Sequence, residues 1–155
     1  MENLERVLRE HPFLRDLHED HVRLLTGCAQ NKRFAPGELL LHEGGEEPTL
    51  YLLRQGTVAL ESHQPGKPAV CVETLEPGDV LGVSWVLGEK AATAAAASLD
   101  ARARDAVLAF ALDGACLRDK MATDDRFGHA LSRRLLERVY LRLARLRLQS
   151  LDVYG

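Results

Sequence analysis

The chemistry that this sequence could perform gathers at one glycine-rich turn, Pro77-Gly78-Asp79-Val80-Leu81-Gly82. Glycine adopts the positive φ of tight turns at little cost, so Gly78 and Gly82 predict a sharply bent backbone here. The residues that follow, Val83–Val86, are expected to begin a short helix. Because backbone N–H groups at a helix start attract negative charge, the predicted chemistry is the binding of a small anionic ligand.

Two side chains after the turn could contribute to such a site. Ser84 could cap the short helix or donate to a ligand, and capping is the favoured interpretation because serine is a preferred N-cap residue. Trp85 is the only tryptophan of the chain. Its ring either stacks on a planar ligand or fills the pocket itself, and filling is the favoured interpretation.

Neither the histidines nor the cysteines predict a metal site or a catalytic site. His18 and His21 are three residues apart and lack a third ligand of the kind that zinc requires. The three cysteines are odd in number and far apart, so we expect no disulfide and regard each cysteine as a small core residue. The sequence therefore predicts no metal, no enzyme and a reducing, cytoplasmic setting.

The composition is that of one ordinary globular domain spanning residues 1–155. Hydrophobic residues make up 46% and charged residues 28% of the chain. A net charge of −3 gives no overall attraction to nucleic acid or to an anionic membrane. No apolar run approaches the roughly 20 residues that span a bilayer, so we expect no membrane association.

Helical patterns flank a central region rich in strands. Apolar residues recur at helical spacing over residues 1–30, where Pro12 and Gly27 predict a break and a stop. Residues 113–155 are helical again, with a break expected at Ala122–Asp125. The fold class predicted is therefore mainly β, with N-terminal helices and a long C-terminal helix.

Short aliphatic runs separated by glycine and proline turns fill the region between these helices. Strands at such regular spacing are typical of a sandwich or barrel. The expected strands are Leu39–His42, Leu50–Arg54, Val58–Ser62, Val70–Thr74 and Val107–Leu112.

Three motifs make the chain resemble a cyclic-nucleotide-binding domain of the catabolite-activator and FNR-like sensors. They are Phe34–Glu46, with its Pro-Gly and Gly-Gly turns, the strand and glycine of Leu50–Gly56, and the turn Pro77–Gly82. The resemblance implies a jelly-roll β-barrel over residues 31–112, with a phosphate-binding cassette at residues 77–99. It also implies a regulatory module that does not catalyse a reaction.

The cassette departs from the family pattern at both residues that hold the nucleotide. In the family a Glu holds the ribose and an Arg pairs with the phosphate, but Val83 stands at the Glu position. The Arg position falls near Ala97 in one alignment, which we favour, and on Lys90 in the other. Lysine lacks the planar fork of arginine, so tight cAMP binding by the usual contacts is not expected. The candidate pocket comprises Gly82, Val83, Ser84, Trp85, Lys90 and Arg102.

The C-terminal helix carries an apolar stripe at heptad spacing, formed by Leu136, Val139, Leu143 and Leu146. In the family this helix is a dimer seam, so the resemblance implies a homodimer. The alternative is that the stripe packs onto the chain's own barrel. The same segment holds seven arginines, which either flank the seam in solvent or bind nucleic acid: Arg126, Arg133, Arg134, Arg138, Arg142, Arg145 and Arg147.

These expectations combine into a stand-alone sensor that binds a nucleotide or another small anionic ligand and signals to a partner protein through its C-terminal helices. The chain ends at Gly155, after this helix, so sequence-specific DNA binding by this chain alone is not expected. One alternative is a ligand-free scaffold for dimerisation or docking. A third interpretation is a cAMP binder that uses Lys90 and backbone donors.

Overall fold

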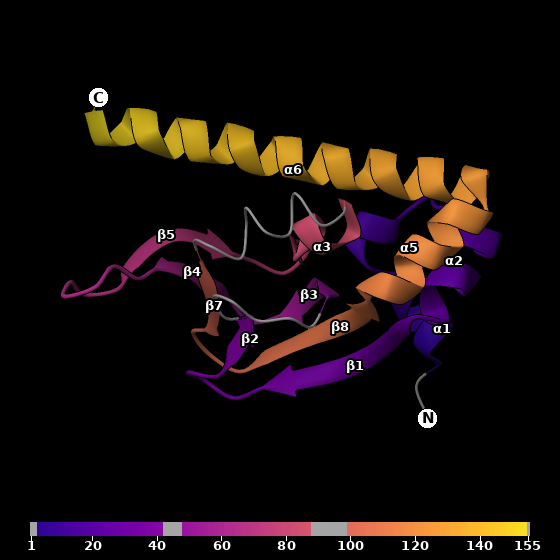
Figure 1. Ribbon diagram of the computed structural model, residues 1–155, viewed down its shortest axis with the longest axis horizontal. Helices are drawn as coiled ribbons and strands as arrows, with labels where there is room; N and C mark the ends of the chain where they lie inside the picture. The colour runs from indigo at the N-terminus through magenta and orange to yellow at the C-terminus, as the bar shows by residue number, and fades with distance from the viewer. Residues whose placement is uncertain (1–2, 42–47, 88–98, 155) are drawn as a thin grey trace.

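Two four-stranded antiparallel sheets form the body of the protein in a computed structural model that describes residues 3–41, 48–87 and 99–154 (Figure 1). One sheet has the order β1-β8-β3-β6 and the other β2-β7-β4-β5. This arrangement confirms the predicted fold class. The strands are β1 (Ala29–Phe34), β2 (Leu39–Leu41), β3 (Thr49–Gln55), β4 (Val58–Ser62), β5 (Val70–Leu75), β6 (Val80–Leu81), β7 (Asp100–Ala103) and β8 (Val107–Asp113).

Strand β3 belongs to two separate apolar cores, one on each face of its sheet. Leu50 and Leu52 pack among the helices, whereas Tyr51 and Leu53 pack between the two sheets. Residues of a strand alternate between faces, so both faces of β3 are covered. This explains why Leu50–Arg54 is a nearly continuous apolar run in the sequence, as expected for a strand without a solvated face.

The helices gather at one end of the sheets, and one of them continues along the molecule. Figure 1 shows α6 running from the end where α2 and α5 lie, past α3, to β5. The predicted break before α6 is confirmed, because Asp124 Oδ1 accepts from Phe127 N at 3.0 Å. The helices are α1 (Leu4–Arg9), the 3-10 turn η1 (Pro12–Leu14), α2 (Glu19–Thr26), α3 (Val83–Leu87), α5 (Gly114–Thr123) and α6 (Asp125–Tyr154). No helix within the described ranges is long and apolar enough to cross a membrane.

Strand β1 lies where the sequence pattern predicts no strand. Its residues, Ala-Gln-Asn-Lys-Arg-Phe, are mostly polar and exposed. They pair with β8 along the full length of the strand, from Ala29 opposite Leu112 to Phe34 opposite Val107. Strand β1 is the edge of its sheet, and charged residues on an edge discourage pairing with another chain. Backbone pairing thus defines a strand that hydrophobic periodicity does not indicate.

A disulfide joins Cys28 to Cys116, so the expectation of unpaired core cysteines was wrong. The two Cα atoms lie 5.8 Å apart although 88 residues separate them in the sequence. Cys71 is free and exposed, so it is not a core residue either. Only the fold brings the end of α2 against α5, and sequence spacing does not reveal this proximity. Because two of the three cysteines form a disulfide, the cysteines no longer support a reducing, cytoplasmic compartment.

We predict that Cys116→Ala lowers the free energy of unfolding by about 2–4 kcal/mol, because a cross-link over a long loop restricts the unfolded chain. Thermal denaturation with and without reductant measures the effect. The matched control is Cys71→Ala, which removes the exposed thiol and should leave the melting temperature unchanged. Equal melting of the oxidised and reduced wild-type protein would contradict the disulfide.

Candidate ligand-binding site at the turn before α3

Backbone and side-chain hydrogen bonds fix the turn at residues 76–79 onto strand β3. Gly78 N donates to Leu53 O at 2.9 Å, and Leu53 N donates to Asp79 O at 3.0 Å. The Asp79 carboxylate accepts from Glu76 N at 2.8 Å, which closes the turn from inside. Gly78 has a φ of +97°, as predicted for a tight glycine turn. These hydrogen bonds join the turn to the sheet, and the turn leads into β6 and α3.

Gly82, at the end of this turn, is required by both its backbone angle and its surroundings. Its φ is +91°, in the region that side chains with a Cβ rarely adopt. A Cβ added at Gly82 would also overlap the carbonyl oxygen of Thr49. The backbone of the cassette thus passes directly against β3 where α3 begins.

Helix α3 contains three of the residues predicted for the pocket. Val83 is half-buried and packs against the core formed with the helices, and Val86 is buried in the same core. Ser84 is half-buried. Trp85 lies within α3, but its side chain is outside the described residues, as are Lys90 and Ala97. The pocket roles predicted for these residues remain predictions.

Arg102 is held on the outer face of its strand. Its Nε donates to Glu61 Oε1 at 2.9 Å and its Nη1 to Gly37 O at 2.7 Å. The neighbours on either side, Ala101 and Ala103, are buried between the sheets. Because neighbouring residues of a strand point to opposite faces, the guanidinium points away from the barrel interior. This placement gives no support to the predicted contact between Arg102 and a ligand.

The space between the sheets is apolar in the part of the chain that the structure describes. Tyr51 is its most polar member, and the Tyr51 hydroxyl donates to Leu40 O at 3.3 Å. The buried polar residues among those described are His11 and Asp79, and neither belongs to this core. A phosphate would therefore have to lie at the edge of the barrel, near the turn, and the interior would receive an apolar or planar group.

Arginines of α6 bind the acidic residues next to the turn. Arg142 forms a bidentate ion pair with Glu73, at 2.8 and 2.9 Å, and donates to Val80 O at 3.1 Å. Arg145 Nη2 lies 3.0 Å from Asp79 Oδ2, and Arg138 Nη1 lies 3.8 Å from Asp79 Oδ1. We call these five residues the α6 clamp: Glu73, Asp79, Arg138, Arg142 and Arg145.

The clamp is largely removed from solvent, which makes its charges interdependent. The side chains of Glu73 and Asp79 are 9% and 3% exposed. Removing one partner of such a pair leaves an uncompensated buried charge, at a cost of about 3–5 kcal/mol. Replacing a whole buried ion-pair cluster by apolar residues of similar volume is often neutral, so the pairs are weak evidence of added stability. What they show is that α6 is joined to β5 and to the turn.

His11 contacts the same carbonyl oxygen of β3, that of Leu53, to which Gly78 of the turn donates. Its Nδ1 accepts from Phe13 N at 3.1 Å, so Nε2 carries the proton and donates to Leu53 O at 2.8 Å. Burial lowers the pKa of His11 below its ordinary value, and this outweighs the opposite effect of the hydrogen bond to Leu53. The imidazole is therefore neutral near pH 7 and acts as a fixed donor to β3.

Sequence reasoning missed the clamp, although a signal for it exists. Arg138, Arg142 and Arg145 are spaced by four and three residues, which places them on one face of a helix. Leu131 and Leu135, which are fully or almost fully buried, continue that face toward the start of α6. An arginine stripe in line with buried leucines indicates acidic partners on the surface that the leucines contact.

Comparisons with known proteins agree with this geometry. The family model described as "Cyclic nucleotide-binding domain" matches residues 31–124. A structure from Geobacter metallireducens GS-15, named for cyclic nucleotide binding, is 25% identical, with a TM-score of 0.74 over 92% of this chain and 99% of its own. A cyclic nucleotide-binding domain from Methylobacillus flagellatus KT is 20% identical, with a TM-score of 0.75 over 96% and 81%. The sensor domain of the transcriptional regulator DNR from Pseudomonas aeruginosa is 15% identical, with a TM-score of 0.67 over 90% and 93%.

We predict that Gly82→Ala destabilises the fold by about 2–5 kcal/mol, which adds the left-handed backbone cost to that of an overlap with β3. The matched control is Gly37→Ala, because Gly37 has a φ of +89° but no atom within 4 Å of an added Cβ. This control should lose only about 1–2 kcal/mol. Urea denaturation measures both variants. Equal losses would show that the contact with Thr49 does not constrain the turn.

Proposed function

The chain belongs to the cyclic nucleotide-binding domain family, and from that premise we propose that it is a sensor module without catalytic activity. It binds a small ligand at the barrel edge next to α3. Ligand binding changes the position of α6, and a partner protein recognises that change. The ligand class is a nucleotide or another small anion with a planar or apolar part. The apolar side chains between the sheets would contact the planar or apolar part, and the charged part would lie at the turn.

The α6 clamp is the observation that supports this proposal. Asp79 closes the turn that precedes α3, and the same carboxylate pairs with Arg145 of the output helix. A ligand that shifts the turn therefore changes the partners available to α6. A ligand moves such an equilibrium only by its difference in affinity for the two states, and the clamp provides contacts that can differ between them.

A second copy of the chain is the partner that the exposed face of α6 favours. Leu136 is 70% exposed, and Val139 and Leu143 are about 40% exposed. Leu146 is half-buried. The face of α6 that contacts the barrel is formed by Leu135 and the clamp arginines, so Leu136 and Leu143 remain free for a two-fold interface.

The rival function is a ligand-free scaffold whose role is dimerisation or docking. The apolar packing between the sheets favours it, because neighbouring side chains of that core bury Leu53, Leu75 and Ala109 completely. Both functions use the same exposed face of α6. A ligand-binding experiment therefore distinguishes the sensor from the scaffold, whereas a measurement of the oligomeric state does not.

We predict that at least one cyclic mono- or dinucleotide raises the melting temperature by about 5–10 °C when present at 100 times its Kd. The reason is that a ligand that binds only the folded state stabilises it by about 2.7 kcal/mol at this concentration. Differential scanning fluorimetry with cAMP, cGMP and cyclic dinucleotides is the measurement. No shift with any of them overturns the nucleotide sensor and favours the scaffold. A cAMP response that disappears in Lys90→Ala favours binding through that lysine.

Transmission to α6 is tested on the same samples by hydrogen exchange. The ligand should alter exchange at α6 amides around Arg142 in the wild-type protein, and the change should shrink in Arg142→Gln. Arg147→Gln is the matched control, because Arg147 is exposed on the same helix and outside the clamp. Ligand binding without any change in α6 would exclude signalling through this helix.

We also predict that Leu143→Asp converts a dimer into a monomer, because a charge at the centre of an apolar two-fold interface is repeated by symmetry. Sedimentation velocity measures the change. The matched control is Leu148→Asp, since Leu148 is 64% exposed on the opposite flank of α6 and should remain dimeric. A dimer that withstands Leu143→Asp contradicts this seam.

A further inference from the structure

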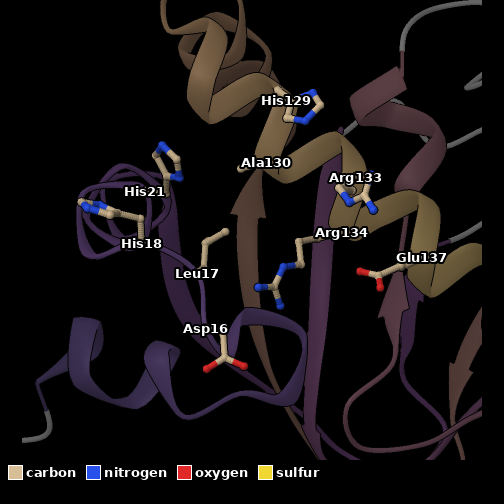
Figure 2. Close-up of a pocket in the computed structure, with 9 residues that line it drawn as sticks. All are labelled: Asp16, Leu17, His18, His21, His129, Ala130, Arg133, Arg134 and Glu137. Carbon is tan, nitrogen blue, oxygen red and sulfur yellow. The ribbon is translucent and has the colours of Figure 1, made fainter.

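A recess with a volume of about 510 Å³ lies between the N-terminal helical segment and the first turns of α6. Leu17 and Ala130 provide its apolar part. Figure 2 shows His21 on the N-terminal side and His129 on the α6 side, with Leu17 on the N-terminal segment near Asp16. Its volume is within the range of small-molecule sites, roughly 300–1,000 Å³. It is separate from the turn at residues 76–82, none of whose residues lines it.

Two consecutive arginines of α6 line this recess, and their guanidinium groups have almost no partner among the described residues. Arg133 is exposed and forms no hydrogen bond or ion pair with the rest of the described chain. Arg134 makes one long hydrogen bond, 3.5 Å from its Nη1 to Phe13 O. In Figure 2 the Arg134 guanidinium reaches from α6 toward the turn that carries Asp16. These arginines thus differ from Arg142 and Arg145, whose guanidinium groups are occupied by the clamp.

Histidine nitrogens add donors beside these arginines. The Nδ1 atom of His21 is buried without a hydrogen-bond partner among the described residues. A proton on that atom would be unsatisfied, so the tautomer with the proton on Nε2 is favoured and Nε2 is a donor. His129 also lines the recess, on the α6 side, and is exposed. Guanidinium forks together with imidazole N–H groups match the three acceptor oxygens of a phosphate monoester.

Two carboxylates in the recess define the rest of the ligand. Glu137 is one helical turn after Arg133, a spacing that favours an ion pair, yet no such pair forms within 4.0 Å in the described structure. Asp16 comes from the N-terminal turn, where its φ is +65°. These oxygens are acceptors without a cationic partner among the described residues, so they would accept from hydroxyl groups. A bare phosphate ion would leave them unused.

We infer that this recess is a second ligand site, which binds a small soluble phosphate monoester that carries hydroxyl groups, such as a sugar phosphate. Arg133 and Arg134 hold the phosphate, with His21 and His129 as additional donors. Asp16 and Glu137 accept from the hydroxyl groups. The site stands on residues that the barrel site does not use, so it does not depend on the proposed sensor function.

Calorimetric titration of the full chain with glucose 6-phosphate tests this inference. We expect saturable one-to-one binding that weakens at least tenfold in Arg133→Gln. Arg147→Gln is the matched control, because Arg147 is an exposed α6 arginine far along the helix, and its binding should stay within twofold of the wild type. Arg133 is exposed, so its replacement should leave the fold intact, which thermal denaturation confirms.

Further probes distinguish a sugar-phosphate site in the recess from a site for bare phosphate, for a cyclic nucleotide or for a lipid headgroup. Inorganic phosphate should bind more weakly than glucose 6-phosphate, and glucose should not bind. The inference is overturned if glucose 6-phosphate does not bind at about 10 mM, a concentration above the Kd of weak specific ligands. Equal weakening in Arg133→Gln and Arg147→Gln also overturns it, as does displacement of the sugar phosphate by a cyclic nucleotide. Binding only to vesicles that contain phosphatidylinositol 4-phosphate would replace the soluble ligand by a lipid headgroup and also overturn it.

Discussion

The burial of one carboxylate, that of Asp79, constrains much of this structure. A charge that is 3% exposed must be paired and hydrogen-bonded, since the cost of leaving it alone in the interior is many kcal/mol. Glu76 N satisfies it from within the turn, and Arg145 satisfies it from the far end of the chain. The local backbone and the long C-terminal helix therefore depend on the same group. A change in either one alters the conditions that the other must meet.

The sequence predicted the class of fold but not all of its strands. Glycine turns and aliphatic runs were sufficient for β3, β4 and β8, because burial imposes a pattern that a single segment records. The β-branched residues Val70 and Val72 indicated β5, although they are exposed. Strand β1 is polar, and its existence depends on pairing with β8. The disulfide between Cys28 and Cys116 depends likewise on two segments far apart in the sequence. Features produced by contact between distant segments leave little trace in either segment alone.

The candidate site likewise has features that the sequence predicted and features that it did not. The turn was predictable because Gly78 and Gly82 are required by their own backbone angles. The surroundings of Arg102 were not, because its ion pair with Glu61 and its outward direction follow from the register of β7 against β4. The arginines of α6 were visible as a basic segment, but their acidic partners on β5 and in the turn lie about 65–70 residues earlier. Charge in a sequence indicates a need for partners without identifying them.

Helix α6 connects these features because its faces serve different contacts. Leu131 and Leu135 anchor its start in the core, and the clamp continues that face to Arg145. Another face exposes Leu136 and Leu143, and the first turns border the recess at Arg133. A helix transmits displacement along its length because its backbone hydrogen bonds resist local bending. A ligand at the turn or in the recess would therefore act on the same element, and the position of α6 is the variable through which both could reach a partner.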